Sequence, residues 1–258
     1  MVVREVLKSG WVGLASVLVL FGGFGAEGQE ANGPEPSAAA DGKPVRLFLL
    51  SGQSNMVHLN PEDRFTPALK KAFPDEEIIV AKFAKSGRAI RSWVPTWKST
   101  KPGDKAKGGK AFYVKLIREA EAALAGRAPK SVTFVWMQGE RDAREGYGAE
   151  YGPALEGLLG QLRETYGRED IDFVLGRLSD HGLDKADEFP GWKGVRQAQE
   201  EFVAADPQRR VWVDTDNFNQ TGDGLHYDEA GRKALGERFA EESIRLIETD
   251  SAQSTAVR

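Results

Sequence analysis

The stretch VRLFLLSGQSNM, residues 45–56, joins an apolar run to a short polar turn and decides the fold of this chain. Its first part, Val45 to Leu50, is almost continuously apolar, as is typical of a strand that is buried on both faces. Further short apolar runs, each bounded by turn or polar residues, follow at residues 78–83, 132–137, 171–175 and 211–213. Together these runs predict a sheet of about five strands.

Apolar residues with helical spacing lie between the predicted strands. Such faces occur at residues 112–124, 155–162, 195–202 and 235–247, with a shorter one at 67–73. Strands that are apolar throughout and alternate with helices favour a parallel sheet with helices on both faces. We therefore predict a single α/β domain, a three-layer α/β/α sandwich.

The composition excludes several kinds of site. The 258 residues include 39 acidic and 35 basic side chains, for a formal charge of −4, and no cysteine. Without cysteine there is no disulfide, thiolate zinc site, iron–sulfur cluster or cysteine nucleophile. The near-neutral charge provides no general attraction for nucleic acid, so no nucleic-acid partner is expected. The three histidines, His58, His181 and His226, lack the short spacing of metal-binding motifs, and no metal site is predicted.

The two ends of the chain differ from its centre. Ser9 to Ala26 carries no charge and follows Arg4 and Lys8, which is typical of a secretory signal peptide over residues 1–28. Its apolar centre is shorter than the about 20 residues of a membrane span, although an uncleaved N-terminal anchor is the alternative. Cleavage would give a secreted or periplasmic protein with no stable membrane association. We further predict a flexible linker at 29–44, the folded domain at 45–248 and a disordered tail at 249–258.

Residues suited to acyl transfer follow the predicted strands, at the sheet edge where ligands bind in parallel α/β proteins. Ser54 comes after the first strand, and Asp223 and His226 precede the last helix. A serine hydroxyl needs an adjacent base to act as a nucleophile, and a carboxylate orients that base. An oxyanion also needs hydrogen-bond donors. The available donors are the backbone N–H groups of Ser54 and Gly87 and the side-chain amide of Gln138.

Three motifs resemble those of the SGNH hydrolase superfamily. They are G-Q-S-N-M at residues 52–56, W-M-Q-G-E-R-D at 136–142 and D-G-L-H at 223–226. In this order they are most similar to the sialate O-acetylesterase-like group, which includes plant and bacterial carbohydrate acetylesterases, and the resemblance extends from about Val45 to Ile247. It implies a flavodoxin-like fold with no metal or organic cofactor. It also implies a catalytic triad of Ser54, His226 and Asp223, and an oxyanion hole formed by Ser54, Gly87 and Gln138.

Several neighbouring residues bear on the substrate rather than on the chemistry. His58 and Arg88 stand where the family often has small residues, and both are candidates for the wall of the substrate pocket. Trp93 follows the Gly87 turn, where it could either stack on a sugar ring or cover the edge of the sheet. The carboxylates of Glu140 and Asp142 are expected to orient neighbouring loops rather than to take part directly in the chemistry.

These features predict a secreted serine esterase that removes O-acetyl groups from an acetylated oligo- or polysaccharide through an acyl-enzyme. Two alternatives remain. One is a lipase or thioesterase of the same superfamily, although no long apolar lid is evident between the motifs. The other is a non-catalytic carbohydrate-binding module on this fold, although every catalytic position holds a competent residue.

Overall fold

A parallel five-stranded sheet forms the centre of the protein. The computed structural model describes residues 42–218 and 223–256, so the predicted signal peptide and most of the predicted linker lie outside the described residues. The strand order is β2-β1-β3-β4-β5, and every neighbouring pair is parallel. This confirms the predicted fold class. The strands are β1 (Val45–Gly52), β2 (Glu77–Ala84), β3 (Ser131–Met137), β4 (Asp172–Gly176) and β5 (Arg210–Val213).

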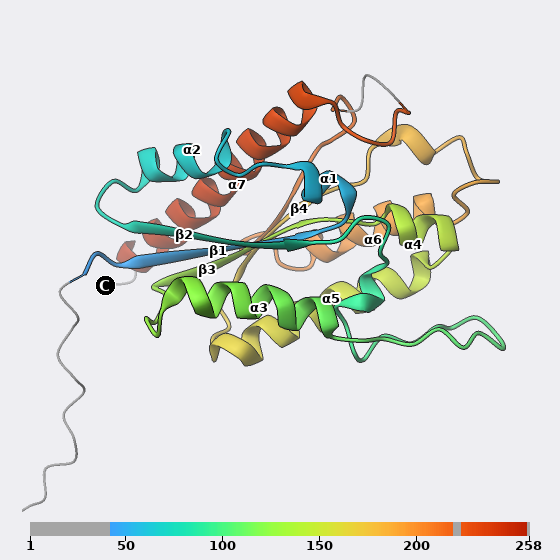
Figure 1. Cartoon of the computed structure of the whole chain (residues 1–258), viewed down its shortest axis with the longest axis horizontal. Helices are drawn as coiled ribbons and strands as arrows, with labels where there is room; N and C mark the ends of the chain where they lie inside the picture. Colours follow the sequence, from blue (N-terminus) through green and yellow to red (C-terminus); the bar gives the residue numbers. More distant parts are fainter. Residues whose placement is uncertain (1–41, 219–222, 257–258) are drawn as a thin grey trace, which may run out of the picture. The chain divides into compact units, whose positions relative to one another are not determined.

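Helices cover both faces of the sheet (Figure 1). One face packs against α3 (Ala111–Leu124), α5 (Gly148–Tyr166) and α6 (Trp192–Ala204). The other packs against α2 (Phe65–Ala72) and α7 (Glu229–Ala256). Strand β1 is apolar throughout because Leu47 and Leu49 belong to the first core, whereas Phe48 and Leu50 belong to the second.

Short helical segments stand at the carboxyl ends of the strands. Helix α1 (Ser54–His58) follows β1, and α4 (Glu140–Glu145) follows β3. Two 3-10 turns, η1 (Ile90–Ser92) and η2 (Asp180–Gly182), come after β2 and β4. Segments as short as α1 and α4 are not stable as isolated helices, so they depend on the packing around them. Together they form the rim on which the candidate site is built.

Helix α7 continues as far as Ala256 and so includes most of the stretch, 249–258, that is predicted as a disordered tail. Arg209, which precedes β5, forms an ion pair with Asp250. Thr249 also donates a hydrogen bond to the carbonyl oxygen of Arg245, at 2.8 Å. Polar contacts therefore hold the helix beyond Ile247, the last large apolar residue of α7. Among the described helices, none combines the length and the apolar character needed to cross a membrane.

Candidate active site

Three side chains from distant segments form a hydrogen-bonded chain at the rim. Ser54 is the first residue of α1. The His226 Nε2 atom lies 3.0 Å from Ser54 Oγ, and His226 Nδ1 lies 2.7 Å from Asp223 Oδ2. The structure thus brings together the three residues predicted as a triad, with a carboxylate behind the imidazole and a hydroxyl in front of it. This arrangement is suited to removing the hydroxyl proton during nucleophilic attack.

Asp223 is held as an ionised carboxylate. Its Oδ1 atom accepts hydrogen bonds from the backbone N–H groups of Leu225, at 2.9 Å, and His226, at 2.8 Å. Partial burial raises the pKa of Asp223, but the bonds from His226 and Leu225 outweigh it and lower the pKa to about 2. At neutral pH the carboxylate is therefore available to orient the imidazole and to stabilise its protonated form.

An open pocket of about 220 Å³ lies in front of Ser54 and His226. Its walls come from the segments that follow β1, β2, β3 and β4, together with the segment that carries His226, which is the edge predicted from the sequence. The lining residues are Gln53, Ser54, Ser86, Gly87, Glu140, Arg141, Arg144, Phe189, Leu225 and His226.

Two backbone N–H groups remain as candidate oxyanion donors. Ser54 begins α1, and the N–H of a first helical residue has no acceptor within its own helix. Gly87 lines the same pocket and has a φ of 66°. No atom lies within 4 Å of the position that a Cβ would take at Gly87. The left-handed backbone, rather than crowding, therefore favours glycine here.

Gln138 is predicted as an oxyanion donor, and its side-chain amide is bonded within the protein. Its side chain is fully buried and does not line the pocket. The Nε2 atom faces three acceptors: Asp142 Oδ2 at 2.7 Å, Gln53 Oε1 at 3.1 Å and the Arg88 carbonyl oxygen at 3.2 Å. These contacts connect Gln138 to the loop around Gly87 and to α4.

The three predicted substrate-binding side chains also lie outside the pocket lining. Trp93 is fully buried, and its Nε1 atom donates to Ser51 Oγ at 3.0 Å. Its ring packs edge-on against Trp136, with ring centroids 5.2 Å apart. The suggestion that Trp93 stacks on a sugar ring is therefore wrong, because the side chain belongs to the core. His58 ends α1 and is exposed, and it is not among the residues that line the pocket. Arg88 is exposed next to Gly87, but its side chain does not line the pocket.

Two buried carboxylates of α4 reach different parts of the rim. Glu140 Oε1 accepts a hydrogen bond from Asn55 Nδ2 at 3.0 Å. Asp142 Oδ2 accepts one from the backbone N–H of Ile90 at 2.8 Å. Burial raises the pKa of Glu140, and it raises the pKa of Asp142 to about 7 against the effect of its hydrogen bonds. Their contacts connect α4 to α1 and to the loop after β2.

Sequence reasoning missed several pocket residues. Arg141 and Arg144 stand three residues apart on α4, and both line the pocket. Arg144 pairs with Glu188 at 2.5 Å, and its guanidinium carbon lies 4.9 Å from the centroid of the Phe189 ring. The two arginines of the E-R-D-A-R stretch could have been recognised as pocket residues only if a helix had been predicted at residues 140–145, because the helix places them on the same side.

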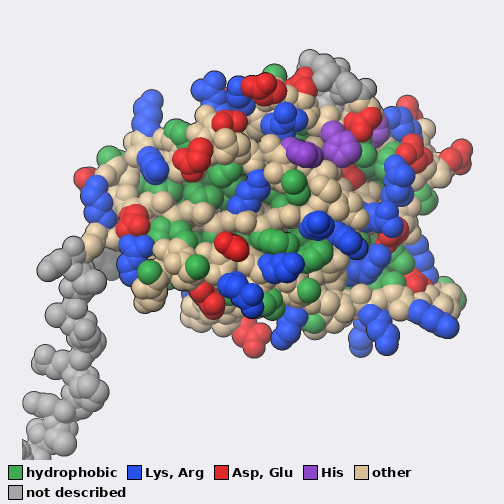
Figure 2. Space-filling view, viewed as in Figure 1, with side chains coloured by type: hydrophobic (Ala, Val, Ile, Leu, Met, Phe, Trp, Pro, Cys, Tyr) green, Lys and Arg blue, Asp and Glu red, His purple; other side chains and the backbone are tan. Residues whose placement is uncertain are grey.

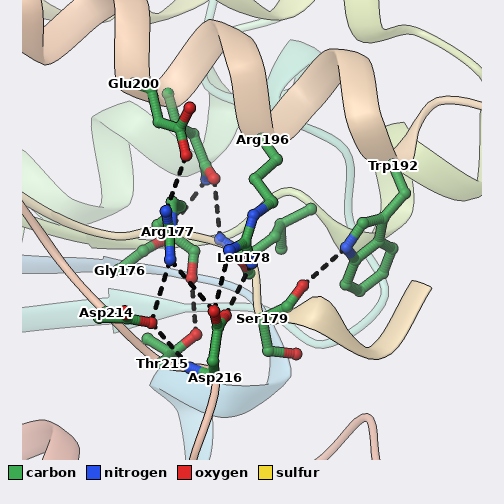
Figure 3. A network of polar contacts seen from close by, with 11 residues as sticks. Gly176, Arg177, Leu178, Ser179, Trp192, Arg196, Glu200, Asp214, Thr215 and Asp216 are labelled. Atoms are coloured by element: carbon green, nitrogen blue, oxygen red, sulfur yellow. Dashed lines mark hydrogen bonds and ion pairs between the residues drawn. The ribbon is translucent and has the colours of Figure 1, made fainter. Parts of the chain in front are cut away.

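An ionic network holds the start of the segment that leads to His226 (Figure 3). Arg196 of α6 donates to both carboxylate oxygens of Asp216, at 2.7 and 2.9 Å. Arg177, which follows β4, contacts Asp216 at 3.2 Å and Asp214 at 3.1 Å. The arginines thereby fix the chain just after β5, before it turns toward the candidate triad.

Comparison with solved structures supports the fold. A protein from Arabidopsis thaliana has a TM-score of 0.60 and 18% identity, over 77% of this chain and 97% of its own. XAC1771, a carbohydrate acetylesterase from Xanthomonas citri, has a TM-score of 0.53 and 17% sequence identity, over 76% of this chain and 55% of its own. NanS has a TM-score of 0.54 and 12% sequence identity, over 82% of this chain and 100% of its own.

A sequence search of curated proteins finds no significant match. In contrast, the family model described as carbohydrate esterase, sialic acid-specific acetylesterase, matches residues 57–245. This match covers most of the chain, includes the second and third motifs, and confirms the predicted resemblance to the sialate O-acetylesterase-like group. The first motif, residues 52–56, lies just before the matched range. The chain therefore belongs to the carbohydrate esterase, sialic acid-specific acetylesterase family and is a carboxylic ester hydrolase.

Proposed function

We propose that the protein removes O-acetyl groups from carbohydrates through an acetyl-enzyme on Ser54. The hydrogen-bonded chain from Asp223 through His226 to Ser54 is the observation that carries this proposal. His226 Nε2 takes the hydroxyl proton as Ser54 Oγ attacks the ester carbonyl carbon. The backbone N–H groups of Ser54 and Gly87 stabilise the negative charge that develops on the carbonyl oxygen.

The rest of the cycle returns the enzyme to its starting state. The bond between the carbonyl carbon and the sugar oxygen breaks, and the sugar oxygen takes the proton from the His226 imidazolium. Water then loses a proton to His226 and attacks the acetyl-enzyme. The bond to Ser54 Oγ breaks, the proton returns to this oxygen, and acetic acid leaves as acetate.

The surroundings of Ser54 favour a short acyl group on a polar substrate. The pocket is small, and Arg141, Arg144 and Glu140 contribute polar groups to its lining. Hydrophobic side chains form small separate patches on the face seen in Figure 2. Val114 is the sole large hydrophobic side chain that is exposed within the described part of the chain. A lipase acting at an apolar surface would be expected to present a larger patch.

Acetate release by the purified protein tests this function. We expect acetate from O-acetylated sialosides, xylan or pectin, and faster hydrolysis of an aryl acetate than of the matching octanoate. Ser54→Ala should lower kcat by at least about 10³-fold, whereas Ser99→Ala on a surface loop should retain the activity. Preference for octanoate would favour the lipase alternative. Binding of acetylated glycans without any turnover would favour the binding module.

We also propose that the protein is exported. The sequence of residues 1–28, with basic residues before an apolar stretch and small residues after it, supports a cleaved signal peptide. N-terminal sequencing of the protein released from expressing cells should find a mature chain that begins close to residue 29. An intact N-terminus in the membrane fraction would instead favour the anchor.

A further inference from the structure

A single buried side chain contacts the backbone on both sides of His226. Asn55 follows Ser54 in α1 and is only 2% exposed. Its Nδ2 atom donates to the carbonyl oxygen of Leu225 at 3.2 Å, and its Oδ1 atom accepts from the N–H of Tyr227 at 3.1 Å. The helix that carries the nucleophile is thus joined directly to the two residues that flank the candidate base.

Glu140 fixes the orientation of this amide. Its side chain is 4% exposed, and its Oε1 atom accepts the second hydrogen of Asn55 Nδ2 at 3.0 Å. With two acceptors at Nδ2 and a backbone donor at Oδ1, the Asn55 amide has one satisfactory orientation. Glu140 begins α4, directly after β3, so the connection is anchored at the centre of the sheet.

The imidazole of His226 is much more exposed than the Asn55 side chain that contacts its neighbours. The side chains of His226 and Asp223 are 45% and 56% exposed. Upstream, the arginine network holds Asp216, which lies ten residues before His226 (Figure 3). Because packing covers only about half of the imidazole, buried contacts next to His226 have a large influence on where the ring lies.

From this geometry we propose that Asn55, oriented by Glu140, is a positioning residue that sets the approach of His226 Nε2 to Ser54 Oγ. The proposal rests on the proposed function, because it concerns the same proton transfer. A misplacement of about 1 Å can lower the rate of a reaction about 10²-fold. Asn55→Ala should therefore lower kcat about 10²-fold and leave KM for an aryl acetate nearly unchanged, since Asn55 does not line the pocket.

A set of variants separates positioning from a direct effect of Glu140. We expect Glu140→Ala to lower kcat about 10-fold, and Glu140→Gln to lower it less, because glutamine still offers an acceptor to Asn55. The double variant Asn55→Ala/Glu140→Ala should be no slower than Asn55→Ala alone, since both residues act through one connection. If the kcat losses of the two single variants multiply in the double variant, Glu140 does not act through Asn55, and this part of the proposal would be overturned. Asn60→Ala, whose amide contacts the nearby Asp63 at the surface, is the matched control.

The position of His226 can also be followed without any turnover. The chain has only three histidines, so their ring signals in NMR spectra can be assigned with single variants. In Asn55→Ala the His226 signals should shift or broaden, while those of His58 and His181 stay in place. Asn55→Asp keeps the acceptor for Tyr227 N–H but loses both donated bonds, and it provides the same test if the alanine variant does not fold.

The outcomes distinguish the two proposals. Unchanged His226 signals together with unchanged kcat per titrated active site would overturn the role of Asn55. An inactive wild-type protein would reject the proposed function, whereas the NMR comparison would still decide whether Asn55 positions the imidazole. A lower melting temperature with unaltered kcat and unaltered His226 signals would show a structural role alone and would also overturn the proposal.

Discussion

At the scale of single residues, Asp142 makes the stability of the folded protein depend on pH. Its side chain is fully buried, with Oδ2 bonded to Ile90 and Gln138 and Oδ1 without a partner. Burial raises its pKa from 3.8 to about 7. Between these two values the unfolded chain has released the proton and the folded protein still holds it. This group therefore makes folding less favourable as the pH rises through that range.

We predict that Asp142→Asn removes this pH dependence. In the wild type, one such group lowers the free energy of unfolding by up to about 1.4 kcal/mol per pH unit between pH 4 and pH 7. Urea unfolding of both proteins at pH 5, 6, 7 and 8 would show a smaller decline for the variant. Asp104→Asn is the control, because the pKa of Asp104 is about 2 and it does not titrate in this range. Equal declines for wild type and Asp142→Asn would contradict the prediction.

Residue roles were predictable where local sequence fixes them. Asp223 and His226 lie three residues apart, and Ser54 follows a strand, so their meeting follows from the parallel topology. The environments of Gln138 and Trp93 could not be predicted in this way. Gln138 turns toward Asp142, and Trp93 packs on Trp136, because loops from other strands supply those partners. The direction of a side chain at a strand end depends on these distant neighbours.

At the scale of elements, the turn from β1 into α1 depends on Gly52. Its φ is 146°, and a Cβ at this position would lie 2.0 Å from the carbonyl oxygen of Met137. The same oxygen accepts a hydrogen bond from the N–H of Gln53 at 2.9 Å. The close contact between the ends of β1 and β3 is what sets Ser54 at the start of its helix.

We predict that Gly52→Ala lowers the free energy of unfolding by about 3 kcal/mol or more, through backbone strain and the clash with Met137. Gly160→Ala is the matched control. Gly160 is exposed within α5, and nothing lies within 4 Å of its Cβ position, so alanine should stabilise the protein by about 0.5–1 kcal/mol. Chemical denaturation of the three proteins measures both effects. A Gly52→Ala variant as stable as wild type would refute this account of the turn.

The long elements could be predicted from periodicity, whereas the short ones could not. All five apolar runs are strands, and the apolar faces at 112–124 and 155–162 lie in α3 and α5. Helices α1 and α4 have five and six residues, too few for a recognisable helical pattern. The structure shows that α4 supplies Arg141 and Arg144, so the pocket lining was the part of the site least accessible from sequence.

At the scale of the whole molecule, one sheet with two cores supports the site. The parallel order β2-β1-β3-β4-β5 brings the carboxyl ends of all strands to one edge. Both cores are built from apolar side chains, and the chain contains no cysteine that could add a disulfide. Gln53 and Ser54 stand at the end of β1, while the arginine network and Asn55 contact the segment that leads to and carries His226.

Active-site labelling tests the central claim most directly. The purified protein would be treated with a fluorophosphonate, digested and analysed by mass spectrometry, with His226→Ala as a comparison. We predict a single adduct on Ser54 that forms quickly in the wild type and at least about 10²-fold more slowly in His226→Ala. No adduct, an adduct on another serine, or equal labelling rates in the two proteins would contradict the assignment of Ser54 and His226 as nucleophile and base.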